Sequence, residues 1–146
     1  TMGMALTPCI VPAAGKPNFT LEEDEMEMGL GIHGEPGVRK EKIRTADEVV
    51  EELVGRVLED QPLQAGDEVA VLVNGLGGTP LMELFIMNRK VNAILTAMGV
   101  KIHDTNVGNY MTSIEMAGAS VSILKLDDEL KGYYGAKADT VAYKHF

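Results

Sequence analysis

The sequence is poor in cysteine, in basic residues and in long apolar runs. Its one cysteine, Cys9, cannot form an internal disulfide, which favours a reducing, cytoplasmic location. Lys and Arg total 13 against 22 Asp and Glu, so the formal net charge is −9. This balance argues against binding to nucleic acid or to an anionic membrane, because both need clustered positive charge. No apolar run approaches the roughly 20 residues of a membrane-spanning helix.

The chain is nevertheless well supplied with residues for a core. Its 146 residues are 45% apolar and 24% charged, which is typical of one globular domain. No signal peptide is apparent. A start at Thr1-Met2-Gly3 resembles the interior of a longer polypeptide, so we expect a fragment. Residues 1–20 contain Pro8, Pro12, Gly15 and Pro17 and are expected to be irregular or extended.

Periodicity predicts the regular elements. Met26, Met28, Leu30 and Ile32 alternate with Glu27 and glycines, which indicates a strand ending at a turn over residues 33–37. Thr45 and Glu48 form a capping box ahead of a helix. Further strands are expected at 68–73, 100–102, 107–114 and 119–126, with the last two as a hairpin-like pair. A second helix is expected with Thr79 as its cap and Pro80 at its first position, running to about Met98 and stopping at Gly99.

Two amphipathic helices are few for this many strands. They suffice to cover one face of a single sheet. The predicted fold class is therefore α/β, a two-layer sandwich in which helices cover one face of a mixed sheet. A doubly wound fold is disfavoured because residues 108–126 carry no helical stripe.

His33 is the first candidate functional residue. It follows a predicted strand and precedes Gly34 and the Pro36-Gly37 turn, so its imidazole would be firmly held and accessible. Position alone favours an ordinary surface histidine at the end of a strand over a functional one, and that interpretation stays open.

The loop Asn74-Gly75-Leu76-Gly77-Gly78 is the second candidate. A glycine loop between a strand and a helix can present N–H groups to an anion. The loop matches neither the Walker A motif nor Gly-x-Gly-x-x-Gly. A tight connection that uses glycine for its backbone freedom is the equally good alternative.

Other chemistries find little support. His33, His103 and His145 lie far apart in sequence and Cys9 stands alone, so no metal site is expected. The serines lie in strand-like segments without a nucleophile elbow, which argues against a serine triad. The nine methionines are typical of core filling.

Four strings nevertheless resemble one family. The segment Gly29-Leu-Gly-Ile-His-Gly-Glu-Pro-Gly37, preceded by Glu27, resembles the substrate-histidine segment of dihydroxyacetone kinases. The strings at residues 12–17, 73–84 and 108–118 are similar to that family too, in the same order. The resemblance covers nearly all of the chain and assigns it to the substrate-binding subunit.

The resemblance implies which part of the subunit this chain is and which residues bind the substrate. The chain, residues 1–146, would be the second, carboxy-terminal domain of that subunit, with the first domain and its aspartate base absent. His33 would hold dihydroxyacetone as a covalent hemiaminal and is the implied catalytic and substrate-binding residue. Asn74, Gly75, Gly77 and Gly78 would shape the rim of the active site or a domain contact.

The resemblance also implies partners. A separate nucleotide-binding subunit would carry ADP or ATP with Mg²⁺, so this chain would bind no cofactor itself, and the complete subunit would be a cytoplasmic homodimer. The chain ends like family members that depend on phosphoenolpyruvate and the phosphotransferase system. The alternatives are a dihydroxyacetone-sensing coactivator that is not an enzyme, and a single-chain ATP-dependent kinase. The chain alone is expected to be inactive because the base lies elsewhere.

Overall fold

The computed structural model of the protein describes residues 1–32 and 35–146. This part forms a six-stranded sheet of order β3-β2-β1-β6-β4-β5 and a separate β7-β8 pair. The elements, in chain order, are β1 (Met2–Ala5), β2 (Glu25–Met28), β3 (Arg39–Lys42), α1 (Ala46–Asp60), β4 (Glu68–Gly75), α2 (Leu81–Ala97), β5 (Lys101–Gly108), β6 (Gly118–Leu126), α3 (Asp128–Tyr134), β7 (Ala138–Asp139) and β8 (Lys144–His145).

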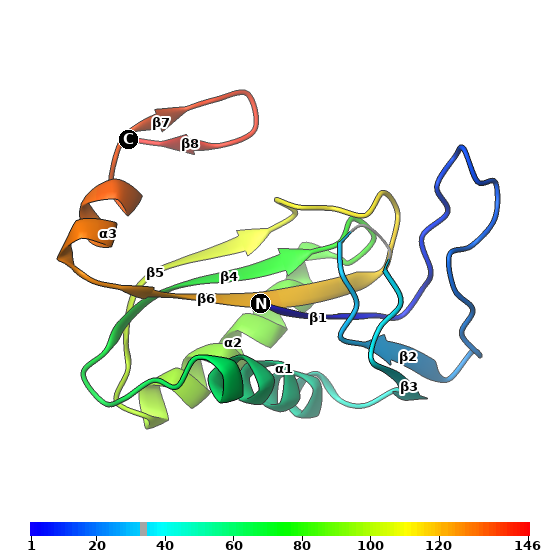
Figure 1. Ribbon diagram of the computed structural model, residues 1–146, viewed down its shortest axis with the longest axis horizontal. Coiled ribbons are helices and arrows are strands. Elements are labelled where there is room, and N and C mark those ends of the chain that lie inside the picture. The colour runs from blue at the N-terminus through cyan, green and yellow to red at the C-terminus, as the bar shows by residue number, and fades with distance from the viewer. Residues whose placement is uncertain (33–34) are drawn as a thin grey trace.

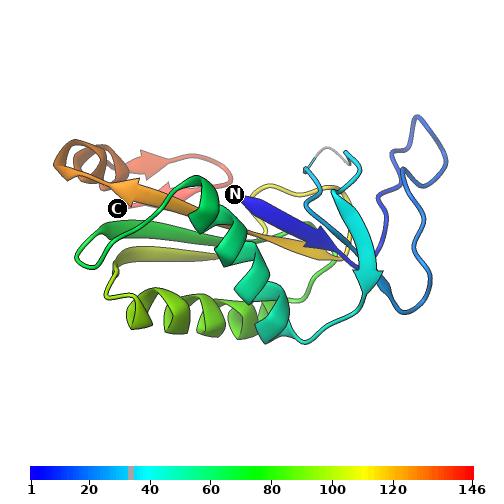
Figure 2. The same ribbon diagram turned by 60° about the horizontal axis from the view of Figure 1, so that its bottom comes forward.

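Helices α1 and α2 lie side by side on one face of this sheet (Figures 1 and 2). Alternate residues of β4, Val69, Val71 and Val73, point into the main core between the layers. The opposite face of the sheet, called the open face here, carries loops instead of long helices. The predicted two-layer α/β fold with a mixed sheet is therefore confirmed. Within the described residues, no helix has the length and apolar character needed to cross a bilayer.

Local sequence signals locate the two long helices correctly. The capping box at the start of α1 is formed: the Glu48 N–H donates to Thr45 Oγ1 at 3.4 Å, and the Thr45 N–H donates to a Glu48 carboxylate oxygen at 2.9 Å. Helix α2 ends at Ala97 with Met98 as its C-cap, and Gly99 follows with a φ of 73°, as its position in the sequence predicts.

The predicted hairpin between 107–114 and 119–126 is wrong. Residues 101–108 form one strand, β5, which pairs in parallel with β4, while β6 pairs antiparallel with the other edge of β4. Strand β4 thus separates β5 from β6, and residues 109–117 must cross the end of β4. The sequence suggests a hairpin because the two strands are neighbours along the chain, whereas pairing is decided by the buried, apolar β4.

The lead-in segment, expected to be irregular or extended, begins with a strand that belongs to the sheet. Residues 2–5 form β1, which lies inside the sheet between β2 and β6. Strand β2 is shorter than its alternation predicts, because Gly29 adopts a φ of 80° and turns the chain off the sheet. Leu30 and Ile32 therefore leave the strand and join Leu76 in a second, smaller apolar cluster.

Strand β3 is fixed to α1 by an ion-pair network. Glu52 of α1 accepts hydrogen bonds from Arg39 and Arg44, each at 2.6 Å. Burial raises the pKa of Glu52, but the hydrogen bonds from the two guanidinium groups outweigh it and leave that pKa below its ordinary value. This network holds the chain in place directly after the segment that contains His33.

Candidate functional site

A cavity opens on the open face of the sheet. Its volume is about 380 Å³. Its floor includes Gly3 of β1 and Ser120 of β6. The space above Gly3 is tight, because a Cβ there would lie 3.1 Å from the Leu30 carbonyl oxygen. The loop after β2 therefore packs directly on the backbone of β1.

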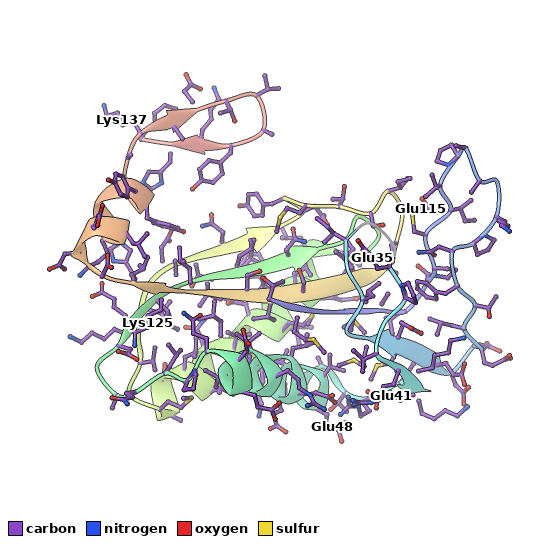
Figure 3. The ribbon with its side chains drawn as sticks, viewed as in Figure 1. Glu35, Glu41, Glu48, Glu115, Lys125 and Lys137 are labelled. Carbon is purple, nitrogen blue, oxygen red and sulfur yellow. The ribbon has the colours of Figure 1, made fainter. Side chains whose placement is uncertain are left out.

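Two walls rise from that floor. The loop after β2 supplies residues 29–32 and Glu35, and the chain beyond β4 and β5 supplies Leu76 and Met111. Glu35 lies on the side of the sheet away from α1 and α2 (Figure 3). Its carboxylate covers Gly31, where a side chain would collide with it.

His33 and Gly34 lie outside the described residues. The residues on either side of them, Ile32 and Glu35, both line the cavity. The segment is tied to the sheet before and after: the Gly29 N–H donates to the Gly3 carbonyl and the Val38 N–H to the Met28 carbonyl, each at 2.7 Å. Both ends of the segment that contains His33 in the sequence are thus hydrogen-bonded to the sheet.

The glycine loop after β4 has its N–H groups occupied within the protein. The Leu76 and Gly78 N–H groups donate to the carbonyls of Gly118 and Met116 at 3.1 and 2.9 Å. The Gly77 N–H donates to Asn109 Oδ1 at 3.2 Å. These three donors are therefore already used within the protein, and the glycines allow two chain segments to pack closely.

Asn74 organises the crossing connection from beneath. It is fully buried at the end of β4. Its Oδ1 accepts from the N–H groups of Tyr110 and Met111, both at 2.9 Å, and its Nδ2 donates to the Met111 carbonyl at 2.8 Å. Met111 is thereby placed in the cavity wall by an amide side chain that no apolar residue could replace.

Thr79 does not cap α2 as predicted. Pro80 occupies the N-cap position, and the helix begins at Leu81. The Thr79 hydroxyl is buried, donates to the Gly118 carbonyl at 2.7 Å and accepts from the Gly118 N–H at 2.8 Å. The start of β6 lies close enough to take both bonds, so tertiary contact prevails over local capping.

Thr79→Val should therefore destabilise the fold. Valine keeps the shape but removes both hydrogen bonds. The Gly118 carbonyl keeps its bond from the Leu76 N–H, whereas the Gly118 N–H loses the Thr79 oxygen, so we expect a loss of about 1–3 kcal/mol. Urea unfolding of the chain measures it. Thr96→Val, at an exposed position on α2, is the control and should change the free energy of unfolding by less than about 0.5 kcal/mol. Equal effects of the two substitutions would refute the role of the hydroxyl.

A polar cluster that the sequence did not indicate joins α3 to β5. The Tyr134 hydroxyl donates to Asp104 at 2.9 Å and accepts from Asn106 at 2.8 Å. Burial, together with the bond to Asp104, raises the pKa of Tyr134 well above its ordinary value. His103 contacts Glu68 at 2.9 Å. We interpret this cluster as an attachment of α3, whose seven residues carry too little pattern to predict.

The remaining candidates stay apart from the cavity lining. His145 packs edge-on against Tyr134, with ring centroids 6.5 Å apart. Among residues 1–32 and 35–146, no three His, Cys, Asp or Glu side chains gather as a metal site would require. The string at residues 12–17 belongs to the loop that projects beyond β1 and β2 (Figure 1), and none of its residues is among the described lining of the cavity.

Comparison with known proteins agrees with this geometry. The Dak1 domain matches residues 1–142. The chain is 47% identical over 144 residues to the PTS-dependent dihydroxyacetone kinase 2, dihydroxyacetone-binding subunit DhaK, of Listeria innocua, covering 99% of this chain and 44% of that protein. The chain thus spans less than half the length of this curated relative.

Two solved structures share the fold. One is described as a dihydroxyacetone kinase operon co-activator, DhaQ, with a TM-score of 0.86 and 35% identity over 99% of this chain and 46% of the other. The dihydroxyacetone kinase of C. freundii, in complex with AMP-PNP and Mg²⁺, gives a TM-score of 0.84 at 25% identity, covering 99% of this chain and 26% of that one. Sequence and structure together establish that the chain belongs to the Dak1 domain family.

Proposed function

We propose that this chain is the carboxy-terminal domain of the dihydroxyacetone-binding subunit of a dihydroxyacetone kinase. The observation that supports it best is spatial. Three strings that resemble the family, within residues 29–37, 73–84 and 108–118, are far apart in sequence, yet each contributes a residue to the lining of the same cavity. In this proposal the cavity is part of the substrate site, and the first domain of the subunit completes it.

His33 is proposed to bind the substrate covalently. A lone pair on one ring nitrogen attacks the ketone carbon, and the C=O π electrons move to the oxygen. That oxygen takes up a proton while the other ring nitrogen releases one, so the hemiaminal forms with no other reactant. Glycerol has no carbonyl, so this bond selects ketone over alcohol by chemistry instead of by pocket size.

The bond also orients a terminal hydroxyl for phosphorylation to dihydroxyacetone phosphate. Positioning is the main contribution of a protein to phosphoryl transfer. The phosphoryl donor is proposed to lie on a partner subunit that holds ADP or ATP with Mg²⁺. The occupied N–H groups of the glycine loop support this assignment, since the loop of this chain has few donors to spare for phosphate.

Phosphoenolpyruvate, acting through the phosphotransferase system, is the proposed source of the phosphoryl group. The name of the Listeria innocua relative favours it. The co-activator among the structural relatives favours a second candidate, a sensor that binds dihydroxyacetone without turnover. The kinase from C. freundii, of which this chain covers only 26%, favours a third, a longer ATP-dependent enzyme.

One assay separates the three candidates. The full-length subunit is supplied with dihydroxyacetone and either phosphoenolpyruvate, the phosphotransferase proteins and the nucleotide-binding subunit, or ATP alone. We expect product only with the first mixture, and none from glycerol. Binding without product in either mixture would identify a sensor, and turnover with ATP alone would identify a self-sufficient kinase. The 146-residue chain is expected to be inactive in both mixtures, because the proposed base lies outside it.

A further inference from the structure

Glu27 is an unusual residue for the place it occupies. It lies in β2, opposite Ala5 of β1 and Lys40 of β3. Its side chain points to the open face, since Met26 and Met28 on either side of it pack into the main core. Although it is a carboxylate on the polar side of an amphipathic strand, it is only 4% exposed.

The carboxylate is bound by the loop that carries His33. Its Oε1 accepts a hydrogen bond from the Gly37 N–H at 2.8 Å. A Cβ on Gly37 would lie 2.7 Å from Glu27 Cγ and would collide with the Met28 carbonyl, so only glycine allows this approach. Glu27 and Gly37 therefore form a matched pair in which a glycine backbone is seated on a buried acid.

The second oxygen of Glu27 makes the burial costly. In the described part of the chain, Oε2 is buried and has no hydrogen-bond partner. A buried carboxyl group with one oxygen left without a hydrogen bond is unfavourable compared with an apolar side chain of the same size. Since a methionine would fill this space without that penalty, stability of the sheet alone does not account for an acid here.

We infer that Glu27 is a positioning residue for residues 30–37, the segment that contains His33 and is called the substrate-attachment segment here. This inference rests on the proposed function. The segment's upstream end is fixed by the bond from Gly29 to Gly3. Its downstream end is fixed by Glu27 through Gly37 and by the bond from Val38 to Met28. Glu27 touches no substrate in this scheme; it limits the positions that the loop between its two tied ends can take.

Three variants of the full-length subunit test the inference. Glu27→Gln keeps an oxygen that can accept from Gly37, Glu27→Met keeps the size but has no acceptor, and Glu25→Gln is the control. Glu25 lies on the same face of β2, and its carboxylate accepts from the Glu22 N–H, outside the loop. The adduct is measured by NMR. The protein is labelled with ¹⁵N in its histidine rings and saturated with [2-¹³C]dihydroxyacetone, and a one-bond ¹³C–¹⁵N coupling then shows the covalent bond directly.

Glu27→Met is expected to raise KM about 10- to 100-fold, the range implied by losing a hydrogen bond to a charged group. It should leave kcat within about threefold, since bound substrate still reacts. Glu27→Gln should restore KM to within about threefold of the parent, and Glu25→Gln should match the parent. The adduct population at a fixed dihydroxyacetone concentration should follow the same order.

Two results would overturn the inference: an unchanged KM in Glu27→Met, or equal losses in the Gln and Met variants. If Glu27→Met fails to fold, Glu27→Thr takes its place in the test and is judged by the same two criteria. Threonine favours a strand but is too short to reach Gly37. Absence of the coupling in the parent protein is a different outcome, because it rejects the proposed function. Hydrogen exchange of the Gly37 amide then still tells whether Glu27 restrains the loop.

Discussion

His33→Ala in the full-length subunit should eliminate the covalent adduct. Without the proposed imidazole nucleophile, the site would hold dihydroxyacetone by non-covalent contacts alone, and kcat/KM should fall by at least about 100-fold, as expected when a reacting group loses its fixed orientation. The ¹³C–¹⁵N coupling described above is the direct measurement. Acidification of the parent protein should also reduce the adduct, since a protonated ring has no lone pair to donate.

The control for this substitution is His145→Ala. His145 packs on Tyr134 and is not among the residues that line the cavity. We expect it to retain the adduct and to keep kcat/KM within about threefold of the parent, as for a surface substitution. An adduct that survives in His33→Ala would disprove the assignment of His33, whatever the activity.

Gly77→Ala should have the second-largest effect, on stability. Gly77 adopts a φ of 121°, which L-residues rarely occupy, and a Cβ there would collide with the Ile114 carbonyl. The strained backbone alone costs about 1–3 kcal/mol. Because the colliding atom is backbone, we expect a total loss of at least about 3 kcal/mol, together with disruption of the cavity wall.

Gly55→Ala provides a control of opposite sign. Gly55 lies within α1, and a Cβ there meets no atom within 4 Å. Alanine should therefore stabilise the helix by about 0.5–1 kcal/mol. Urea unfolding of the 146-residue chain measures both variants. If Gly77→Ala unfolds at the same urea concentration as the parent, the tight junction between the glycine loop and residues 109–117 is not important for the fold.

Local signals in the sequence were sufficient for part of this structure. The capping box at Thr45 and the glycine at the end of α2 each specify a helix boundary through bonds made within a few residues. The continuous apolar run of β4 likewise predicts a central strand. These elements fix the fold class, because two helices and several strands leave few ways to build layers.

Features that depend on distant partners could not be read from the sequence. Strand β1 has only four residues, and its pairing with β6 gives it its place. Thr79 is a residue type that often caps helices, but its hydroxyl is hydrogen-bonded to Gly118 instead. Glu27 resembles a solvent-facing residue of an alternating strand, and only the returning loop buries it. In each case a contact between segments remote in the chain overrides the local pattern.

The same remoteness has a consequence for how the protein is made. Met2 of β1 pairs with Val121 of β6, so the centre of the sheet closes only when nearly the whole chain is available. Pairings of such long range are slow to form, because the intervening chain must first lose its freedom. During synthesis on the ribosome, the edge of β1 that pairs with β6 would stay unpaired until β6 emerges. Unpaired strand edges promote aggregation. Cells that produce this domain quickly should therefore depend on chaperones to protect it.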